Sequence, residues 1–106
     1  MTSVSKDIRQ LIKERIGKKD PSAELILFGS RSRGDAHAGS DWDILILLNL
    51  AEVTRETEKM YRNEIVNVEI ETGEPISTYI LSKQTWESKF ASTPFYENVI
   101  REGIRL

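Results

Sequence analysis

The sequence predicts an α/β fold, of the mixed α+β kind, in which helices pack on a small mixed sheet. Three observations predict it. The apolar runs 25–28 and 43–48 are typical of strands covered on both faces, an amphipathic segment precedes them, and a charged stretch separates them from a third run at 76–81. The expected order is helix, strand, strand, helix, strand, helix, helix, and 106 residues suffice for one domain over 1–106.

The first predicted helix lies near the start of the chain. Apolar side chains recur at helical spacing over residues 4–16, at Val4, Ile8, Leu11, Ile12 and Ile16. Gly17 is expected to cap this helix, and Asp20-Pro21-Ser22 is typical of a connecting turn. Between the first two strands, the polar residues 30–40 leave room for little more than a helical turn.

A long helix is predicted from about Ala51 to about Thr72, where charged residues dominate. Residues 65–71 leave helix and strand both open, because apolar and polar side chains alternate there as in a strand. A helix is favoured, since Gly73 and Pro75 together form a good stop signal.

Two short helices are predicted after the third strand. Ser82 is expected to cap the first, and Pro94 is expected to open the second. The aromatic side chains of this region are interpreted as core residues rather than as a platform for a nucleobase. They are Trp86, Phe90, Phe95 and Tyr96.

The bulk composition excludes several function classes. Hydrophobic residues make up 39% and charged residues 30%, as in ordinary globular domains. The formal net charge of −2 argues against general nucleic-acid binding, and the lack of cysteine excludes a disulfide framework and a thiolate zinc site. No window approaches the roughly 18 apolar residues of a membrane helix. The first residues also lack a signal-peptide run, so we expect no membrane partner and a cytoplasmic location.

The segment between the first two strands brings two kinds of chemistry to one edge of the sheet. Gly29 and Ser30 follow the first strand, and after ten further residues Asp41 and Asp43 open the second. Residues i and i+2 of a strand face the same way, so the two carboxylates project together and repel each other unless a cation lies between them. Mg²⁺ is the expected cation, since one or two carboxylates and substrate phosphates commonly hold it. The pattern predicts metal-assisted transfer from a nucleoside triphosphate, with both aspartates as catalytic and metal-binding residues.

A phosphate-binding turn is expected beside these carboxylates. Gly29 lets the backbone turn and lets a phosphate approach without meeting a Cβ, and Ser30 adds a hydroxyl and an N–H. Arg31 and Arg33 are candidate partners for phosphate oxygens. A P-loop is excluded, because Asp35-Ala36 stands where Lys-Ser/Thr is required.

The pattern Gly29-Ser30, ten residues, Asp41-Trp42-Asp43 resembles the signature of the nucleotidyltransferase superfamily with the DNA polymerase β-like fold. The short chain resembles the minimal nucleotidyltransferase branch of that superfamily. In that family the Gly-Ser pair binds the triphosphate and the two aspartates bind magnesium. The resemblance implies these roles for Gly29, Ser30, Asp41 and Asp43, and Arg33 resembles a family position that contacts phosphate.

The chain departs from the family pattern at one point. The family usually carries a third carboxylate on the strand after the long helix, which completes a two-metal site. The run 76–81 contains no carboxylate. Glu74 lies just before that strand, and Glu69 and Glu71 are substitutes only if 65–71 is itself a strand.

The resemblance also implies a protein partner. Minimal members are commonly encoded beside a HEPN-type helical protein, and the pair resembles a toxin–antitoxin system in which the nucleotidyltransferase adenylylates a tyrosine of the HEPN ribonuclease. The implied function is transfer of AMP from ATP to a hydroxyl of that partner, with this chain as the antitoxin. Two alternatives stay open: a catalytically weak or inactive nucleotide-binding module that acts by binding a HEPN-like partner, and a drug-modifying adenylyltransferase.

Four other residues of the motif region receive structural interpretations. Asp35 and Ser40 are typical of turns and caps, and His37 is typical of a mobile surface loop. Trp42 is expected to point away from the two carboxylates and to pack in the core.

Overall fold

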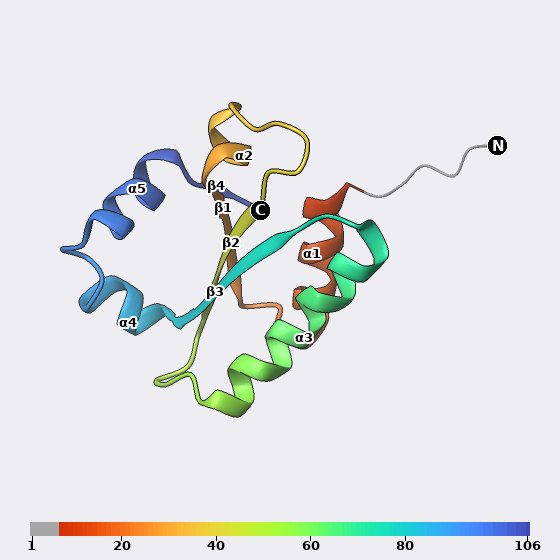
Figure 1. Ribbon diagram of the computed structural model, residues 1–106. Coiled ribbons are helices and arrows are strands. Elements are labelled where there is room, and N and C mark those ends of the chain that lie inside the picture. The colour runs from red at the N-terminus through yellow and green to blue at the C-terminus, as the bar shows by residue number, and fades with distance from the viewer. Residues whose placement is uncertain (1–6) are drawn as a thin grey trace.

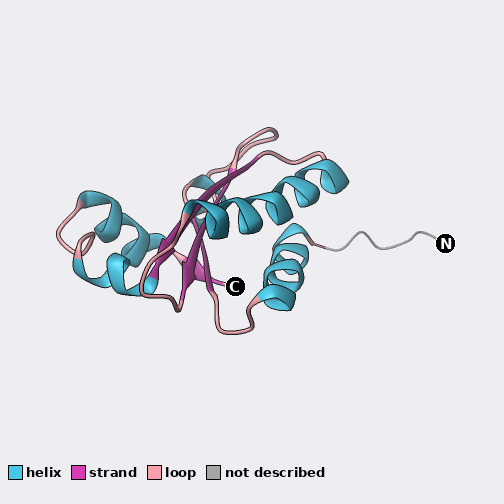
Figure 2. Ribbon diagram, turned by 90° about the horizontal axis from the view of Figure 1, so that it is seen from below, coloured by secondary structure: helices cyan, strands magenta, loops and turns pink. Residues whose placement is uncertain are grey.

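The computed structural model describes residues 7–106. Its elements, in chain order, are α1 (Ile8–Lys19), β1 (Glu24–Phe28), α2 (Ser30–Arg33), β2 (Trp42–Leu48), α3 (Arg55–Thr72), β3 (Ile76–Ser82), α4 (Lys83–Ser88), α5 (Pro94–Glu102) and β4 (Ile104–Arg105). The sheet forms a middle layer, with α1 and α3 on one face and α4 and α5 on the other (Figure 1). The view from below shows the same three layers (Figure 2).

The four strands form one mixed sheet in the order β3-β2-β1-β4. β1 pairs antiparallel with β2 and with β4, and β2 pairs parallel with β3. The predicted small mixed sheet is therefore confirmed. β2 is a central strand, so whatever its first residues carry lies between the ends of two neighbouring strands.

Each face of the sheet has its own hydrophobic cluster. Between the sheet and α1 and α3, the buried side chains include Ile12, Ile16, Leu27, Ile44, Ile46, Ile65 and Val68. Between the sheet and α4 and α5, the buried side chains are Phe28, Leu45, Leu47, Trp86 and Val99. Successive residues along β1, and along β2, thus enter opposite clusters. This is why each strand is a continuous apolar run in the sequence.

The first helix ends later than predicted. Val4 lies outside the described residues, and α1 runs to Lys19, so the prediction that Gly17 caps the helix is wrong. The Asp20 N–H still donates to the Ile16 carbonyl at 2.9 Å, and the Asp20 carboxylate accepts from the Ser22 N–H at 2.9 Å. The chain therefore leaves the helix through the turn that was predicted at Asp20.

The long helix α3 begins at Arg55, later than predicted. The Thr54 hydroxyl accepts the Thr57 N–H at 3.1 Å, and this cap fixes the start of the helix. Residues 65–71 belong to α3, so the prediction of a helix rather than a strand is confirmed. Gly73 adopts φ +74° and closes the helix, as predicted. Of the three apolar residues that alternate with polar ones in this segment, only Val68 is buried, whereas Val66 and Ile70 are exposed on the helix surface.

The C-terminal region confirms two predicted helices and adds a strand. Ser82 caps α4 by accepting the Thr85 N–H at 3.0 Å, and Pro94 opens α5 after the cap residue Thr93. The two-residue strand β4 was not predicted, because so short a segment carries no periodicity. Trp86, Phe90, Phe95 and Tyr96 pack together against the sheet, as expected of core residues.

Among the described helices, none combines the length and the apolar character that crossing a membrane requires.

Candidate functional site

The two predicted carboxylates lie at the N-terminal end of β2. Asp41 immediately precedes the strand, and Asp43 is its second residue. In the sheet, Asp43 is paired with Phe28 on β1 and with Ser77 on β3. The Ser77 hydroxyl donates to Oδ2 of Asp41 at 2.8 Å, so the two aspartates and Ser77 gather on one side of the sheet.

Gly29 lies directly against the Asp43 carboxylate. A Cβ built on Gly29 would lie 2.2 Å from Oδ2 of Asp43, far inside contact distance. Gly29 also adopts φ +78°, a conformation that favours glycine. β1 therefore delivers a residue without a side chain to the position where β2 presents a carboxylate. The structure brings together the two halves of the motif, as the sequence predicts.

The surroundings of Asp43 disfavour the charged form of its carboxyl group. Partial burial raises its pKa, and the negative charge of Asp41 raises the pKa further. Arg33 acts in the opposite direction, whereas Glu102 adds to the increase. A cation between Asp41 and Asp43 would relieve this repulsion, so the pair fits the expected Mg²⁺ ligand set.

Arg33 and Gly29 both contact an acidic side chain from the far end of the chain. The Gly29 N–H donates to Oε1 of Glu102 at 3.1 Å, and Nη1 of Arg33 lies 3.2 Å from the same oxygen and 3.3 Å from Oε2. Nε of Arg33 donates to Asp35 at 3.1 Å. The predicted phosphate-binding groups thus already hold an anionic oxygen. Glu102 was not predicted as a site residue, since no local motif marks it.

Arg31 is placed differently from Arg33. Its guanidinium donates to the Ser40 carbonyl at 3.0 Å, lies 3.8 Å from Glu74, and stacks 4.6 Å above the Trp42 ring. Trp42 packs against the cluster beneath α1 and α3, away from the carboxylates, as expected. Arg31 therefore anchors the loop before β2, and its contact with phosphate stays a prediction.

The remaining residues of the loop have the places expected of a turn. Ser30 is the first residue of α2, and its carbonyl accepts the N–H groups of Gly34 and Asp35. The Ser40 hydroxyl accepts the His37 N–H at 3.0 Å, and His37 is exposed. The role of Ser30 toward phosphate also stays a prediction.

The strand after α3 places a serine, and no carboxylate, beside the aspartate pair. β3 follows α3, and its residue beside Asp43 is Ser77. The acidic residues considered as substitutes are held elsewhere: Glu69 accepts the Ile76 N–H at 3.0 Å, Glu71 pairs with Arg15, and Glu74 lies near Arg31. Across residues 7–106, no three His, Cys, Asp or Glu side chains are grouped closely enough to hold a metal ion.

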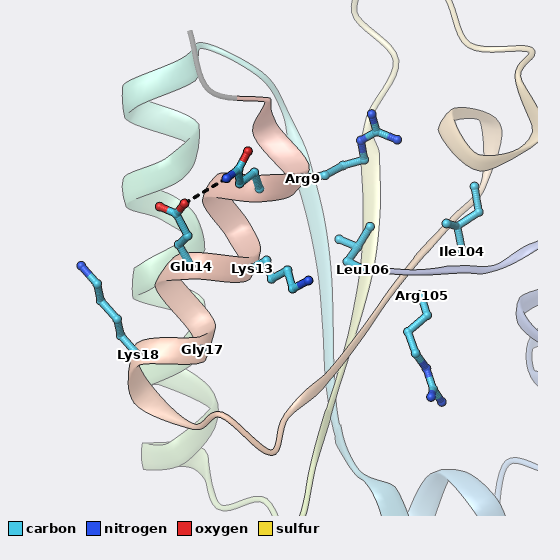
Figure 3. Close-up of a pocket in the computed structure, with 9 residues that line it drawn as sticks. Arg9, Lys13, Glu14, Gly17, Lys18, Ile104, Arg105 and Leu106 are labelled. Atoms are coloured by element: carbon cyan, nitrogen blue, oxygen red, sulfur yellow. Dashed lines mark hydrogen bonds between the residues drawn. The ribbon is translucent and has the colours of Figure 1, made fainter. Parts of the chain in front are cut away.

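A separate groove lies between α1 and the end of the chain. It measures about 770 Å³ and is lined by basic and apolar side chains, among them Arg9, Lys13, Lys18, Arg105 and Leu106. Figure 3 shows Arg9 and Lys13 extending from α1 toward Leu106. None of the predicted site residues lines this groove, so it is distinct from the carboxylate site.

Comparison with protein families gives a match over most of this fold. The model of the nucleotidyltransferase domain matches residues 8–97, which include Gly29, Ser30, Asp41 and Asp43. The chain belongs to the nucleotidyltransferase domain family. Glu102 lies beyond the matched segment. A search of the curated proteins finds no match to this chain.

A solved structure shares the fold of this nucleotidyltransferase domain. It is described as the crystal structure of the toxin-antitoxin with AMP-PNP, and it has a TM-score of 0.64 and 21% sequence identity. The alignment covers 91% of this chain and 69% of the other. At this identity the likeness concerns the fold, which is consistent with the expected polymerase β-like nucleotidyltransferase fold.

Proposed function

We propose that this protein is a Mg²⁺-dependent adenylyltransferase that moves AMP from ATP to a hydroxyl group of a partner protein. One observation carries the proposal: Gly29 lies against the Asp43 carboxylate, while its N–H and the Arg33 guanidinium hold an anionic oxygen. Groups suited to phosphate and groups suited to a divalent cation thus meet at one point. Phosphoryl and nucleotidyl transfer depend mainly on such positioning and charge neutralisation.

The residues of the site divide the work of the reaction. Gly29, Ser30 and Arg33 bind phosphate oxygens, and Asp41 and Asp43 hold the cation. Mg²⁺, when bound, supplies neutralisation of the triphosphate charge. The acceptor hydroxyl oxygen attacks the α-phosphorus, the bond to the β-phosphate oxygen breaks, and pyrophosphate leaves. The hydroxyl proton passes to the carboxylate of Asp43, which acts as the general base of the site.

The acceptor that we propose is a HEPN-type helical protein, with this chain as the antitoxin of the pair. Two observations support a toxin–antitoxin setting. The motif resembles that of the nucleotidyltransferase superfamily, whose minimal branch the short chain resembles, and a structure described as a toxin-antitoxin with AMP-PNP shares the fold. The described residues also include no separate domain beside the sheet that would present a small acceptor.

Transfer from labelled ATP to a partner tests this proposal. We expect label from the α-phosphate of ATP, and none from the γ-phosphate, to appear on a HEPN-type partner in the presence of Mg²⁺. Asp43→Asn should abolish the transfer while leaving the fold intact. Full transfer by Asp43→Asn, or transfer of the γ-label, would contradict the proposed chemistry.

A second candidate function is a binding module without catalysis. Ser77 in place of a third carboxylate favours it, as does the occupation of Gly29 and Arg33 by Glu102. This function predicts a stable complex with the HEPN-type partner and no labelled product. Adenylylated partner would exclude it.

A further inference from the structure

We propose that Glu102 is an acidic residue of the nucleotide site that occupies the phosphate position in the free protein and is displaced by the triphosphate. It thereby sets how much negative charge a ligand must bring to bind. This inference rests on the proposed function, because it assumes that Gly29 and Arg33 receive phosphate.

The hydrogen bonds of Glu102 are those that a phosphate group would make. Its Oε1 accepts the Gly29 N–H at 3.1 Å and lies 3.2 Å from Nη1 of Arg33, and its Oε2 lies 3.3 Å from the same nitrogen. A carboxylate and a phosphate both present anionic oxygens to such donors. While Glu102 holds these groups, a phosphate oxygen cannot pair with the same N–H.

The fold fixes Glu102 in this place. Glu102 is the last residue of α5, and the next residue, Gly103, packs so tightly that an added Cβ would lie 2.4 Å from the Val99 carbonyl and 2.7 Å from Ile26. β4 then pairs with β1 through Ile104 and Leu27. The backbone beside Glu102 is therefore anchored on β1, the strand that ends just before Gly29. Its side chain is only 15% exposed.

The charge of Glu102 also acts on the carboxylate pair. The Gly29 N–H donates to Glu102, and the same glycine lies against the Asp43 carboxylate, so Glu102 and Asp43 flank one residue. Three acidic groups thus share this corner of the molecule, and Arg33 is the cation that faces both Asp43 and Glu102. Displacing Glu102 into solvent moves a negative charge away from the aspartates as the triphosphate arrives.

The competition has a consequence for ligand choice. A triphosphate with Mg²⁺ gains contacts at Gly29, Arg33 and both aspartates, and these together offset the loss of the Glu102 contacts. A monophosphate gains only the contacts that Glu102 already makes. Displacement of Glu102 lowers the affinity of every ligand that takes its place by the same factor, so only a ligand with the further contacts of a triphosphate is expected to bind tightly.

Calorimetric titration of Mg²⁺-ATP into wild type, Glu102→Gln and Glu97→Gln tests the inference. Glu97 is the matched control, since it is an exposed glutamate on the same helix. We expect Glu102→Gln to bind Mg²⁺-ATP about threefold to tenfold more tightly than wild type, because the competing charge is removed. Glu97→Gln should bind as wild type does.

The titrations separate the role of Glu102 from the proposed nucleotide site. Unchanged or weaker binding by a folded Glu102→Gln, with wild type binding Mg²⁺-ATP, would overturn the role of Glu102 alone. Binding by none of the three proteins would overturn the proposed function together with this inference. Glu102→Asp, which keeps the charge on a shorter side chain, serves if the glutamine variant fails to fold, and it should also bind more tightly than wild type.

Discussion

Gly29 and Asp43 lie so close together that a Cβ on the glycine would stand 2.2 Å from the carboxylate oxygen of the aspartate. Gly29 directly follows β1, and Asp43 lies on the neighbouring antiparallel strand β2, where it pairs with Phe28. This contact joins the phosphate-binding turn to the metal-binding pair. It also makes the glycine irreplaceable for two separable reasons, conformation and space.

Substitution of this glycine should affect both stability and metal binding. Gly29→Ala imposes strain at φ +78° and forces the Asp43 carboxylate to turn away. We expect a loss of about 1–3 kcal/mol in the free energy of unfolding and weaker Mg²⁺ binding. Urea unfolding and magnesium titration measure the two effects.

Gly39→Ala is the control for that substitution. Gly39 adopts φ +90°, and nothing lies within 4 Å of a Cβ built on it. This variant should lose stability from backbone strain alone and bind Mg²⁺ as wild type does. Equal magnesium affinity in Gly29→Ala and Gly39→Ala would show that the contact with Asp43 has no role in the site.

The pH dependence of stability should reveal the strained carboxyl group of Asp43. Burial first, and then the charge of Asp41, raise the pKa of Asp43 in the folded protein. Between its ordinary value and the raised value, the folded state binds more protons than the unfolded state. The contribution of Asp43 is therefore favourable at low pH and is lost as the pH rises through the raised pKa.

Asp43→Asn isolates this effect from the other carboxyl groups. The variant should gain stability relative to wild type as the pH increases through that window, and it should keep the gain at neutral pH. Urea unfolding of both proteins at a series of pH values measures the difference. A difference that stays constant with pH would contradict the raised pKa.

The two arginines of the motif should respond differently to truncation. Arg31→Ala removes the hydrogen bond to Ser40 and the stacking on Trp42, so we expect a loss of about 1–2 kcal/mol in stability. Arg33→Ala removes a half-exposed side chain and should change stability little. It should weaken Mg²⁺-ATP binding about tenfold or more, since a charged partner of phosphate is lost. Chemical unfolding and calorimetry of both variants give the comparison, and the reverse order of effects would contradict it.

A carboxylate at position 77 should restore the family pattern. Ser77 pairs in register with Asp43 and donates to Asp41, so Ser77→Asp places a third acid beside the pair. We expect Mg²⁺ affinity to increase about tenfold, and stability without Mg²⁺ to fall by about 1 kcal/mol from charge repulsion.

Ser77→Asn is the matched control, because asparagine has nearly the same shape as the aspartate of Ser77→Asp but carries no charge. It should lose the hydroxyl hydrogen bond to Asp41 and gain no metal affinity. If Asp and Asn at this position bind Mg²⁺ equally, the third carboxylate does not belong at Ser77. Magnesium titration by calorimetry distinguishes these outcomes.

Much of this site is predictable because its parts are local. Gly29 follows the first apolar strand and Asp43 lies near the start of the second, and the connection between them is short. Antiparallel pairing of these two strands therefore brings the two residues together, whatever the rest of the fold. The alternation of side chains along β2 then places Asp41 and Asp43 on one side. The helix stop at Gly73 was also visible in the sequence.

Other parts depend on contacts between distant segments. Glu102 reaches Gly29 only because α5 packs on the sheet and β4 pairs with β1, and no motif near residue 102 signals either event. The place of Arg31 depends on the packing of Trp42 beneath it. The extension of α1 past Gly17 reflects the cap at Asp20, which competes locally with the glycine.

The most direct measurement is a titration of the protein with Mg²⁺-ATP, followed by amide NMR shifts, on wild type and on the Asp41→Asn/Asp43→Asn double variant. We expect shifts concentrated at residues 29–34 and 41–43, with a further change at Glu102, and their loss in the double variant. An absence of shifts at millimolar ligand, or equal shifts in the double variant, would contradict a nucleotide site built on Gly29 and Asp43.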